Sequence, residues 1–342
     1  MGTKKDWSAL LDAAVAAKAT DLHLLPERQP HLRTPAGRLE PLGESALSGE
    51  EIEKIARHLF GKERLERQPE RGVLTLGFRH GEGCMARVSA ASTRGQRSLS
   101  VRLRYDRLPT LETLNVPAVV TERLLTASHG LIVVAGPHGS GKTTTLYALL
   151  DWLNRERTLH ICTIEDPIHY ELSPGKSLVQ QREVGIDAPD VASGIAAAIE
   201  QDLDVLLVGE VRELEALSAA LHAAQTGHLV LMQLHAESGR DALVRLVEAA
   251  PESMHPLIRR ALGESLLGVT SQRLIPKVGG GRVSALEVLV ADDALKQAVQ
   301  AGGDLSGLGD SSSVTLRESV DALHAAGQID DAWAEQARGW GC

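Results

Sequence analysis

The chain has 342 residues, of which 45 are acidic and 36 basic, so its formal net charge is -9. This acidic balance argues against a protein that coats nucleic acid, and we expect no nucleic-acid partner. The cysteines Cys84, Cys162 and Cys342 lie far apart with no CxxC pair, which argues against a disulfide framework or a zinc cluster and favours a reducing cytoplasm.

The length of the chain is roughly twice that of a typical single domain, which predicts two domains with separate cores. The proline-containing stretch near residues 106–118 marks the boundary, giving an N-terminal domain over residues 1–108 and a second domain over residues 109–342. No stretch approaches the ~20 apolar residues of a membrane helix, so we expect neither a membrane span nor export.

The N-terminal domain is predicted to be α+β. Ser48 and Glu51 form a capping-box signature ahead of one of its helices. A turn is expected at Gly81-Glu82-Gly83, between two antiparallel strands. The predicted elements are a helix over residues 7–19, a strand over 21–25, a hairpin over 30–42, a helix over 52–60, and antiparallel strands over 73–91 and 98–105.

From about Leu131 the pattern changes, because apolar strands begin to alternate with helices, which implies a parallel sheet covered by helices. A loose stretch over residues 302–313 precedes a final pair of helices. The predicted strands span residues 131–136, 160–166, 205–210 and 228–234, and the predicted helices span 143–154, 214–225 and 241–250.

A glycine-rich loop stands between the first of these strands and the following helix. Gly136, Gly141, Lys142 and Thr143 fit the pattern GxxxxGK[ST], in which backbone amides and the helix N-terminus bind phosphate oxygens. In such a loop the lysine reaches the β- and γ-phosphates and the threonine hydroxyl joins the Mg²⁺ shell, so Thr143 is the predicted metal ligand. The loop therefore predicts binding of ATP and Mg²⁺, with a nucleotide-binding set of Gly136, His138, Gly139, Ser140, Gly141, Lys142, Thr143 and Thr144.

Hydrolysis also needs a carboxylate that orients water, and carboxylates end two of the predicted strands. Glu210 ends the strand VLLVGE, at the sheet edge where ligands bind in such folds, and is our candidate for the catalytic carboxylate. Glu165 and Asp166 end another strand and are expected to hold the water shell of the metal. The alternative is that both strand-end carboxylates are simply solvated.

Two histidines bracket the strand HLVLMQLH. His228 and His235 are seven positions apart, an odd spacing that sends them to opposite faces of a strand and disfavours a shared metal ligand. We expect His235 to contact the γ-phosphate or to relay its state to a subunit boundary. A structural hydrogen bond at the strand end is the alternative.

The stretch SLSVRLRY alternates apolar and polar residues, so Arg102 and Arg104 project from the same strand face. If the nucleotide of a neighbouring subunit lies opposite, one of the two serves as an arginine finger. A solvated strand face is the alternative.

Taken together, GPHGSGKTTTLYALL, TIEDPIHYEL, QREVG, VGEVRELEAL and TGHLVLMQLH resemble the secretion ATPase superfamily of type II secretion and type IV pili. The segments QREVG and DLHL, with no tetracysteine insert, are most similar to the PilT-type pilus retraction ATPases. The resemblance runs from about residue 7 to residue 330. It implies a PAS-like N-terminal domain, a RecA-like ATPase domain and a ring of six subunits with nucleotide between neighbours.

The same resemblance assigns roles to positions of this chain. It implies an Asp box with Glu165, an atypical Walker B segment with Glu210, a His box ending at His235, and an arginine at Arg102 that reaches the adjacent subunit's nucleotide, with Arg104 as a rival. The implied function is that of a cytoplasmic ATPase motor, peripheral at the inner membrane, which acts on a pilus platform protein to retract pili and drive twitching motility.

Several positions depart from the family pattern. His138 replaces a usual threonine, His169 an acidic residue and Leu203 a proline, and none of these changes removes a phosphate ligand. Residues 293–302 replace a basic segment of the retraction motors, and Lys296 is their one basic residue. An accessory paralogue with weak activity of its own beside a main retraction ATPase, or a motor of a related protein secretion system, is therefore the alternative.

Overall fold

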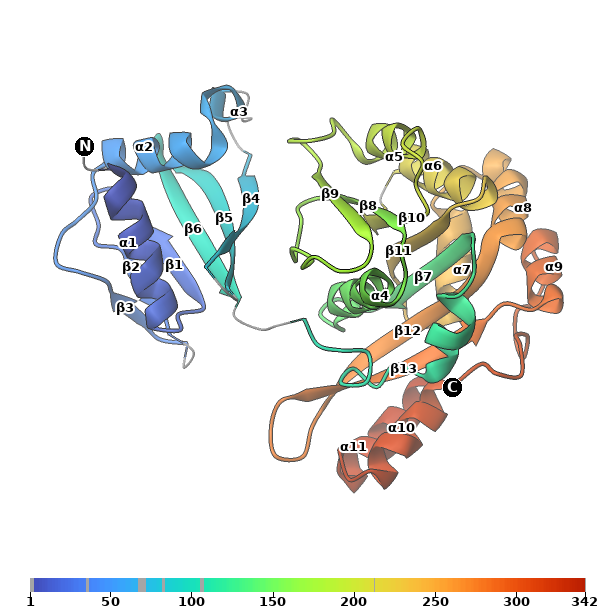
Figure 1. The fold of residues 1–342 in the computed structure, drawn as a ribbon. Helices are drawn as coiled ribbons and strands as arrows, with labels where there is room; N and C mark the ends of the chain where they lie inside the picture. Colours follow the sequence, from blue (N-terminus) through green and yellow to red (C-terminus); the bar gives the residue numbers. More distant parts are fainter. Residues whose placement is uncertain are drawn as a thin grey trace. The chain divides into compact units, whose positions relative to one another are not determined.

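The computed structural model describes residues 3–34, 37–66, 72–81, 84–104, 108–211 and 213–341. The chain forms two compact units (Figure 1). The N-terminal unit comprises residues 1–107 with 167–171, and the C-terminal unit comprises residues 108–166 with 172–342. Residues 82 and 83 of the predicted turn, and Cys342, lie outside the described residues. The predicted domain boundary between residues 108 and 109 stays a prediction.

The N-terminal unit is an antiparallel sheet with helices packed on it, in the strand order β3-β2-β1-β6-β5-β4. Helix α2 starts at the predicted capping box of Ser48 and Glu51, and its apolar face packs into the same core as α1 and the sheet. The elements are α1 (Thr3–Ala16), β1 (Asp21–Leu24), β2 (His31–Arg33), β3 (Leu39–Pro41), α2 (Gly49–Phe60), α3 (Lys62–Glu66), β4 (Leu74–His80), β5 (Cys84–Thr93) and β6 (Gln96–Arg104).

Strand β6 alternates as its sequence predicts. Leu99, Val101 and Leu103 are buried in the core, whereas Ser100 and Arg102 are exposed on the other face. The side chain of Arg104 lies outside the described residues.

The C-terminal unit is built on a seven-stranded sheet in the order β13-β12-β7-β11-β10-β8-β9. All neighbouring strands from β12 to β9 are parallel, and β13 pairs antiparallel with β12. Strands β9, β12 and β13 are not among the strands predicted from the sequence. The strands are β7 (Gly130–Gly136), β8 (His160–Glu165), β9 (Leu178–Glu183), β10 (Val205–Glu210), β11 (Leu229–His235), β12 (Leu266–Pro276) and β13 (Arg282–Val290).

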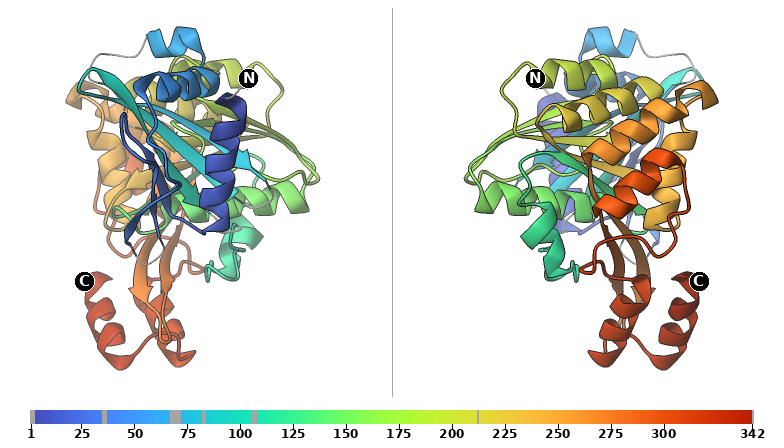
Figure 2. Two further views of the ribbon diagram at one scale, coloured as in Figure 1. Left: turned by 90° about the vertical axis from the view of Figure 1, so that its left-hand side faces the viewer. Right: turned by 90° about the vertical axis from the view of Figure 1, so that its right-hand side faces the viewer.

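Helices cover both faces of this sheet, because each central strand is apolar on both sides. Along β7, Leu131 and Val133 enter the core under α5 to α9, whereas Ile132 and Val134 enter the core under η1 and α4 (Figures 1 and 2). These helical elements are η1 (Val120–Leu124), α4 (Lys142–Glu156), α5 (Val191–Ile199), α6 (Leu214–Gln225), α7 (Gly239–Glu248), η2 (Glu252–Met254), α8 (His255–Ser265) and α9 (Asp293–Ala301).

The predicted final helix pair is present as α10 (Leu316–Ala325) and α11 (Asp331–Arg338), followed by the short turn η3 (Gly339–Gly341). The pair packs on the β12–β13 hairpin, at the end that projects beyond the parallel strands (Figure 2). In the described parts of the chain, no helix combines the length and the apolar composition needed to cross a membrane.

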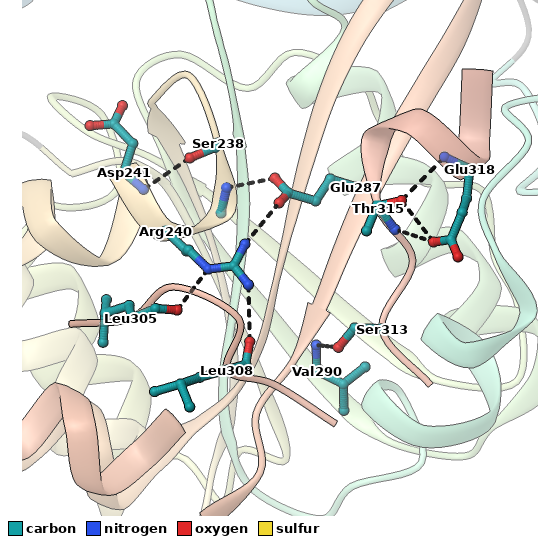
Figure 3. A network of polar contacts seen from close by, with 11 residues as sticks. Ser238, Arg240, Asp241, Glu287, Val290, Leu305, Leu308, Ser313, Thr315 and Glu318 are labelled. Carbon is teal, nitrogen blue, oxygen red and sulfur yellow. Dashed lines mark hydrogen bonds and ion pairs between the residues drawn. The ribbon is translucent and has the colours of Figure 1, made fainter. Parts of the chain in front are cut away.

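A polar network holds the segment between α9 and α10 against the sheet (Figure 3). The Arg240 guanidinium donates to the carbonyl oxygens of Leu305 at 2.8 Å and Leu308 at 3.0 Å. The Glu287 carboxylate lies 3.8 Å from Arg240 and accepts from the Gly239 amide at 2.8 Å. The start of α7, shortly after the end of β11, is thereby tied to the C-terminal segment.

The parallel strands place their last residues along one edge of the sheet. The strands β7, β11, β10 and β8 are consecutive neighbours in the sheet. They end at Gly136, His235, Glu210 and Glu165 respectively. Because parallel strands end on the same side, these residues share the carboxyl edge, where open α/β sheets bind ligands.

Candidate nucleotide-binding site

The glycine loop joins the buried strand β7 to α4. Gly136 and Gly141 have φ values of 150° and 91°, a region that residues with a side chain rarely adopt. A Cβ atom on Gly136 would lie 2.6 Å from the backbone oxygen of Gln272, so only glycine fits there. The loop can therefore fold tightly enough to direct backbone amides toward a bound anion.

The start of α4 leaves donors for such an anion. Gly141 precedes the helix without a side-chain cap, and the first turn carries no acidic residue. Within the described residues, the buried hydroxyl of Ser140 has no hydrogen-bond partner. Helix N-termini attract anions through these amides and through the helix dipole. Gly139 lies in the loop and Thr144 in the first turn of α4, as predicted.

Lys142 lies at the centre of the site, with only 5% of its surface exposed. Its ammonium group donates to the backbone oxygens of Gly136 at 2.9 Å and Pro137 at 2.8 Å, and to Nδ1 of His235 at 3.1 Å. Burial lowers the pKa of Lys142, and the nearby Glu210 carboxylate partly opposes this effect. Phosphate oxygens would offer this buried charge stronger acceptors than the two carbonyl groups do.

His235 connects Lys142 to Glu210. Its Nε2 atom lies 3.4 Å from Oε1 of Glu210. Because an ammonium group can only donate, Nδ1 accepts from Lys142, and a neutral ring then carries its proton on Nε2, toward the carboxylate. The His138 ring stacks on His235, with 5.9 Å between the ring centroids. The structure thus brings together four side chains that the sequence singled out.

Glu165 lies deeper in the unit and is 3% exposed. Its Oε2 atom accepts a hydrogen bond from the phenol of Tyr147 on α4. The side-chain amide of Gln181 on β9 lies 3.5 Å from Oε1 of Glu165. Asp166, the next residue along the chain, is exposed. Of the predicted acidic pair, Glu165 is therefore the buried and oriented member.

Two glutamines that are not among the predicted site residues support the loop. Gln233 on β11 accepts a hydrogen bond from the Thr143 hydroxyl at 3.0 Å. Gln272 on β12 donates to the backbone oxygen of Ser140 at 2.7 Å. Thr143 and Gln233 are 90 positions apart in the sequence, and Ser140 and Gln272 are 132 positions apart. No local sequence signal therefore identifies these contacts.

The predicted arginine belongs to the other unit. Arg102 lies on β6, where its side chain is 67% exposed and lies 3.1 Å from Asp21. His228 immediately precedes β11, and its ring is 3.0 Å from the backbone oxygen of Ala223.

The residues present fit a nucleoside triphosphate with Mg²⁺. The glycine loop, the start of α4 and the unpartnered Ser140 hydroxyl supply anion donors, as described above. Among the described residues, no group of three or more His, Cys, Asp or Glu side chains is arranged to hold a metal. Mg²⁺ is usually bound through few protein ligands together with phosphate oxygens and water, which suits the Thr143 hydroxyl beside the loop. When bound, the metal would neutralise charge on the phosphates.

Comparisons with known proteins identify the family. The profile of the family described as "Type II/IV secretion system protein" matches residues 8–328. The chain belongs to this family. It is 36% identical over 289 residues to the uncharacterized protein YggR of Escherichia coli strain K12, covering 84% of this chain and 87% of YggR. It is 42% identical over 208 residues to the type IV pilus retractation ATPase PilT of Pseudomonas aeruginosa, covering 57% of this chain and 60% of that protein.

A solved structure supports the same assignment. The crystal structure of the pilus retraction motor PilT with bound ADP matches 96% of both chains, with a TM-score of 0.82 and 31% sequence identity. This match confirms the predicted fold, a RecA-like ATPase domain preceded by a smaller domain. It also confirms the resemblance to PilT-like members of the type II/IV secretion ATPase superfamily.

Proposed function

We propose that this member of the secretion ATPase superfamily hydrolyses ATP at the carboxyl edge of the C-terminal sheet and converts the energy into work on type IV pili. The loop from Gly136 to Gly141 binds the phosphates, and Lys142 contacts the β- and γ-phosphates. The Thr143 hydroxyl is a ligand of Mg²⁺. Glu210 orients the attacking water, Glu165 orients the water shell of the metal, and His235 contacts the γ-phosphate.

One observation carries this proposal, namely the connected contacts among Lys142, His235 and Glu210 beside a loop that only glycine can form. Lys142 supplies a positive charge for the phosphates, and Glu210 is a carboxylate that can orient water. The neutral imidazole of His235 connects the two. The alternative, in which the strand-end carboxylates are simply solvated, does not require these contacts.

The assembly we propose is a homo-hexamer in the cytoplasm, peripheral at the inner membrane. Head-to-tail contacts in a ring complete each site with a residue from the neighbour, and we assign that role to Arg102. Nucleotide-driven movement of the subunits then acts on a membrane platform protein and retracts the pilus. The similarity to PilT, a type IV pilus retractation ATPase by name, supports this physiological role.

The chemistry is tested by ATPase assays of the wild type and Glu210→Gln. We expect the variant to bind ATP with unchanged affinity and to hydrolyse it at least about 100-fold more slowly, because it cannot orient water as a carboxylate does. Glu213→Gln, an exposed carboxylate just beyond β10, is the matched control and should hydrolyse ATP normally. An equally active Glu210→Gln protein would remove Glu210 from its role, and an inactive wild type would count against the ATPase itself.

Whether the motor retracts pili, assembles them or exports protein is tested by counting surface pili in a deletion strain. A strain that lacks a retraction motor should carry too many pili and lose twitching motility. Loss of all pili would indicate an assembly ATPase instead, and normal pili with impaired protein export would indicate a motor of a secretion system.

A second candidate function is that of an accessory subunit beside a main retraction ATPase. The observation that favours it is α9, whose residues Asp293–Ala301 carry Lys296 as their one basic side chain. An accessory subunit would show little ATPase activity alone and gain activity when mixed with a paralogous retraction ATPase. Full activity of the purified chain by itself would argue against this role.

A further inference from the structure

Tyr147 lies in the first half of α4, just beyond the glycine loop, and is among the largest side chains of the described chain that are fully buried, at 1% exposure. A phenol removed from water needs a hydrogen-bond partner, because an unsatisfied buried hydroxyl costs about 1–3 kcal/mol. The partner of Tyr147 is a carboxylate oxygen, Oε2 of Glu165 at the end of β8. The helix that follows the loop is therefore joined directly to the buried acid.

Glu165 also requires this contact. A carboxylate that is 3% exposed is costly to keep ionised unless donors compensate for the lost water. Tyr147 supplies one donor to Oε2, and Nε2 of Gln181 lies 3.5 Å from Oε1. The two carboxylate oxygens are thus each faced by a different side chain, which fixes the orientation of the carboxylate plane.

Gln181 is itself held in place. Its Oε1 accepts a hydrogen bond from the Leu172 amide at 2.8 Å, which turns the Nε2 group toward Glu165 and toward the Tyr147 oxygen, 3.5 Å away. Strand β9 pairs with β8 in parallel, with Gln181 opposite Thr163. The three side chains therefore come from α4, β8 and β9 and meet one another, and α4 is the helix that follows the glycine loop.

We propose that Tyr147 and Gln181 are positioning residues of the ATPase reaction, which hold the buried carboxylate of Glu165 in the orientation that hydrolysis needs. This inference rests on the proposed function, in which Glu165 orients the water shell of the metal. Both side chains contact the carboxylate of Glu165. Their effect on the reaction passes through Glu165, since a preorganised acceptor needs no reorientation during turnover.

The test compares kcat and KM for ATP in the full-length wild type, Tyr147→Phe and Gln181→Met. Tyr147→Phe keeps the ring in the core and removes only the donor. We expect its kcat to fall about tenfold, with KM within about twofold of wild type, as befits loss of one hydrogen bond to a charged group. Gln181→Met should lose about threefold in kcat, because its contacts are longer.

Thr145→Val is the matched control. Thr145 lies on the same helix, is 1% exposed, and its hydroxyl has no hydrogen-bond partner within the described residues. Removing this hydroxyl should leave kcat within about twofold of wild type. A thermal unfolding curve and an ADP titration of each variant show whether fold and nucleotide affinity are retained. A Tyr147→Phe kcat within about twofold of wild type, or an equal loss in Thr145→Val, would overturn the inference.

A double-mutant cycle separates positioning from a merely structural role. In a Glu165→Gln background, the substitution Tyr147→Phe should change kcat by less than about twofold, because the carboxylate through which Tyr147 acts is already gone. A further tenfold loss would show that Tyr147 acts by another route and would contradict the proposal. An inactive wild type would contradict the proposed function as well, whereas an active wild type with a fully active Tyr147→Phe would contradict this inference alone.

Discussion

The glycine loop and strand β6 each carry a basic residue that the sequence singles out, Lys142 and Arg102. The two side chains differ in their burial and in their contacts. Lys142 is 5% exposed and donates to three acceptors within its own unit. Arg102 is 67% exposed and has an ion pair with Asp21, an exposed contact of the kind that contributes little to stability. Lys142 is thus held within its own unit, where we propose that it binds phosphate. Arg102 can leave Asp21 at small cost, as our proposal that it acts on a neighbouring subunit requires.

The largest effect that would sharpen this contrast is expected from Arg102. If Arg102 completes the site of the adjacent subunit, Arg102→Ala should lower kcat about 10³-fold and leave ATP binding by each subunit intact, because arginine fingers contribute about 10³–10⁵ in rate. Measuring kcat for Arg102→Ala beside Arg104→Ala decides which arginine acts. Full activity of both variants would contradict the proposed role of strand β6, since neither arginine would then serve a neighbouring site.

A smaller loss, about 100-fold in ATPase activity, is expected for Lys142→Met, with most of the loss appearing as weaker ATP binding. Lys176→Met, an exposed lysine paired loosely with Glu156 at 3.8 Å, is the control and should bind ATP normally. If Lys142→Met bound ATP as tightly as the wild type, the loop would not hold the phosphates as we describe.

The pH dependence of stability tests the burial of Lys142 separately. Because its pKa is lowered in the folded protein, the unfolded chain binds this proton more tightly, and the buried charge destabilises the fold at neutral pH. That cost is fully present below the lowered pKa and disappears as the pH rises toward 10.5, the ordinary value for lysine. The melting temperature of the wild type should therefore improve relative to Lys142→Met as the pH is raised through the lowered pKa toward 10.5. A constant difference would contradict the burial of this charge.

The smallest effect is expected from Gln272, which supports the loop from β12. Loss of its hydrogen bond to Ser140 should raise KM for ATP by roughly twofold to tenfold in Gln272→Leu and leave kcat nearly unchanged, because a net hydrogen bond contributes about 0.5–1.5 kcal/mol. Thr270→Val, on the same strand and equally buried, is the control. A KM unaffected by Gln272→Leu would show that the loop is rigid without this support.

Much of the fold could be predicted because its signals are local. The glycine loop has a fixed spacing and lies between a buried strand and a helix, and Glu210 and Glu165 stand at strand ends that a parallel sheet must bring to one edge. Ser48 and Glu51 mark a helix start within a few residues. The hairpin of β12 and β13 is not predicted from the sequence. Its strand β12 lies beside β7 and carries Gln272, which supports the glycine loop.

The supporting residues of the site could not be predicted in the same way. Tyr147 lies among the buried apolar residues of α4 and looks like an ordinary core residue until β8 is placed beside it, when its phenol faces Glu165. Gln233 and Gln272 contact the loop across long stretches of sequence, and nothing near them in the chain indicates a partner. Such contacts depend on strand order and register, which the sequence pattern of a single strand does not determine.

The central claim is that the glycine loop and Lys142 bind the phosphates of ATP next to Glu210, and a crystal structure with a non-hydrolysable ATP analogue and Mg²⁺ tests it most directly. We expect the phosphates to lie on the loop amides, with the Lys142 ammonium moved from the oxygens of Gly136 and Pro137 to the β- and γ-phosphates. An analogue bound elsewhere, with Lys142 still on both carbonyl groups, would contradict the account.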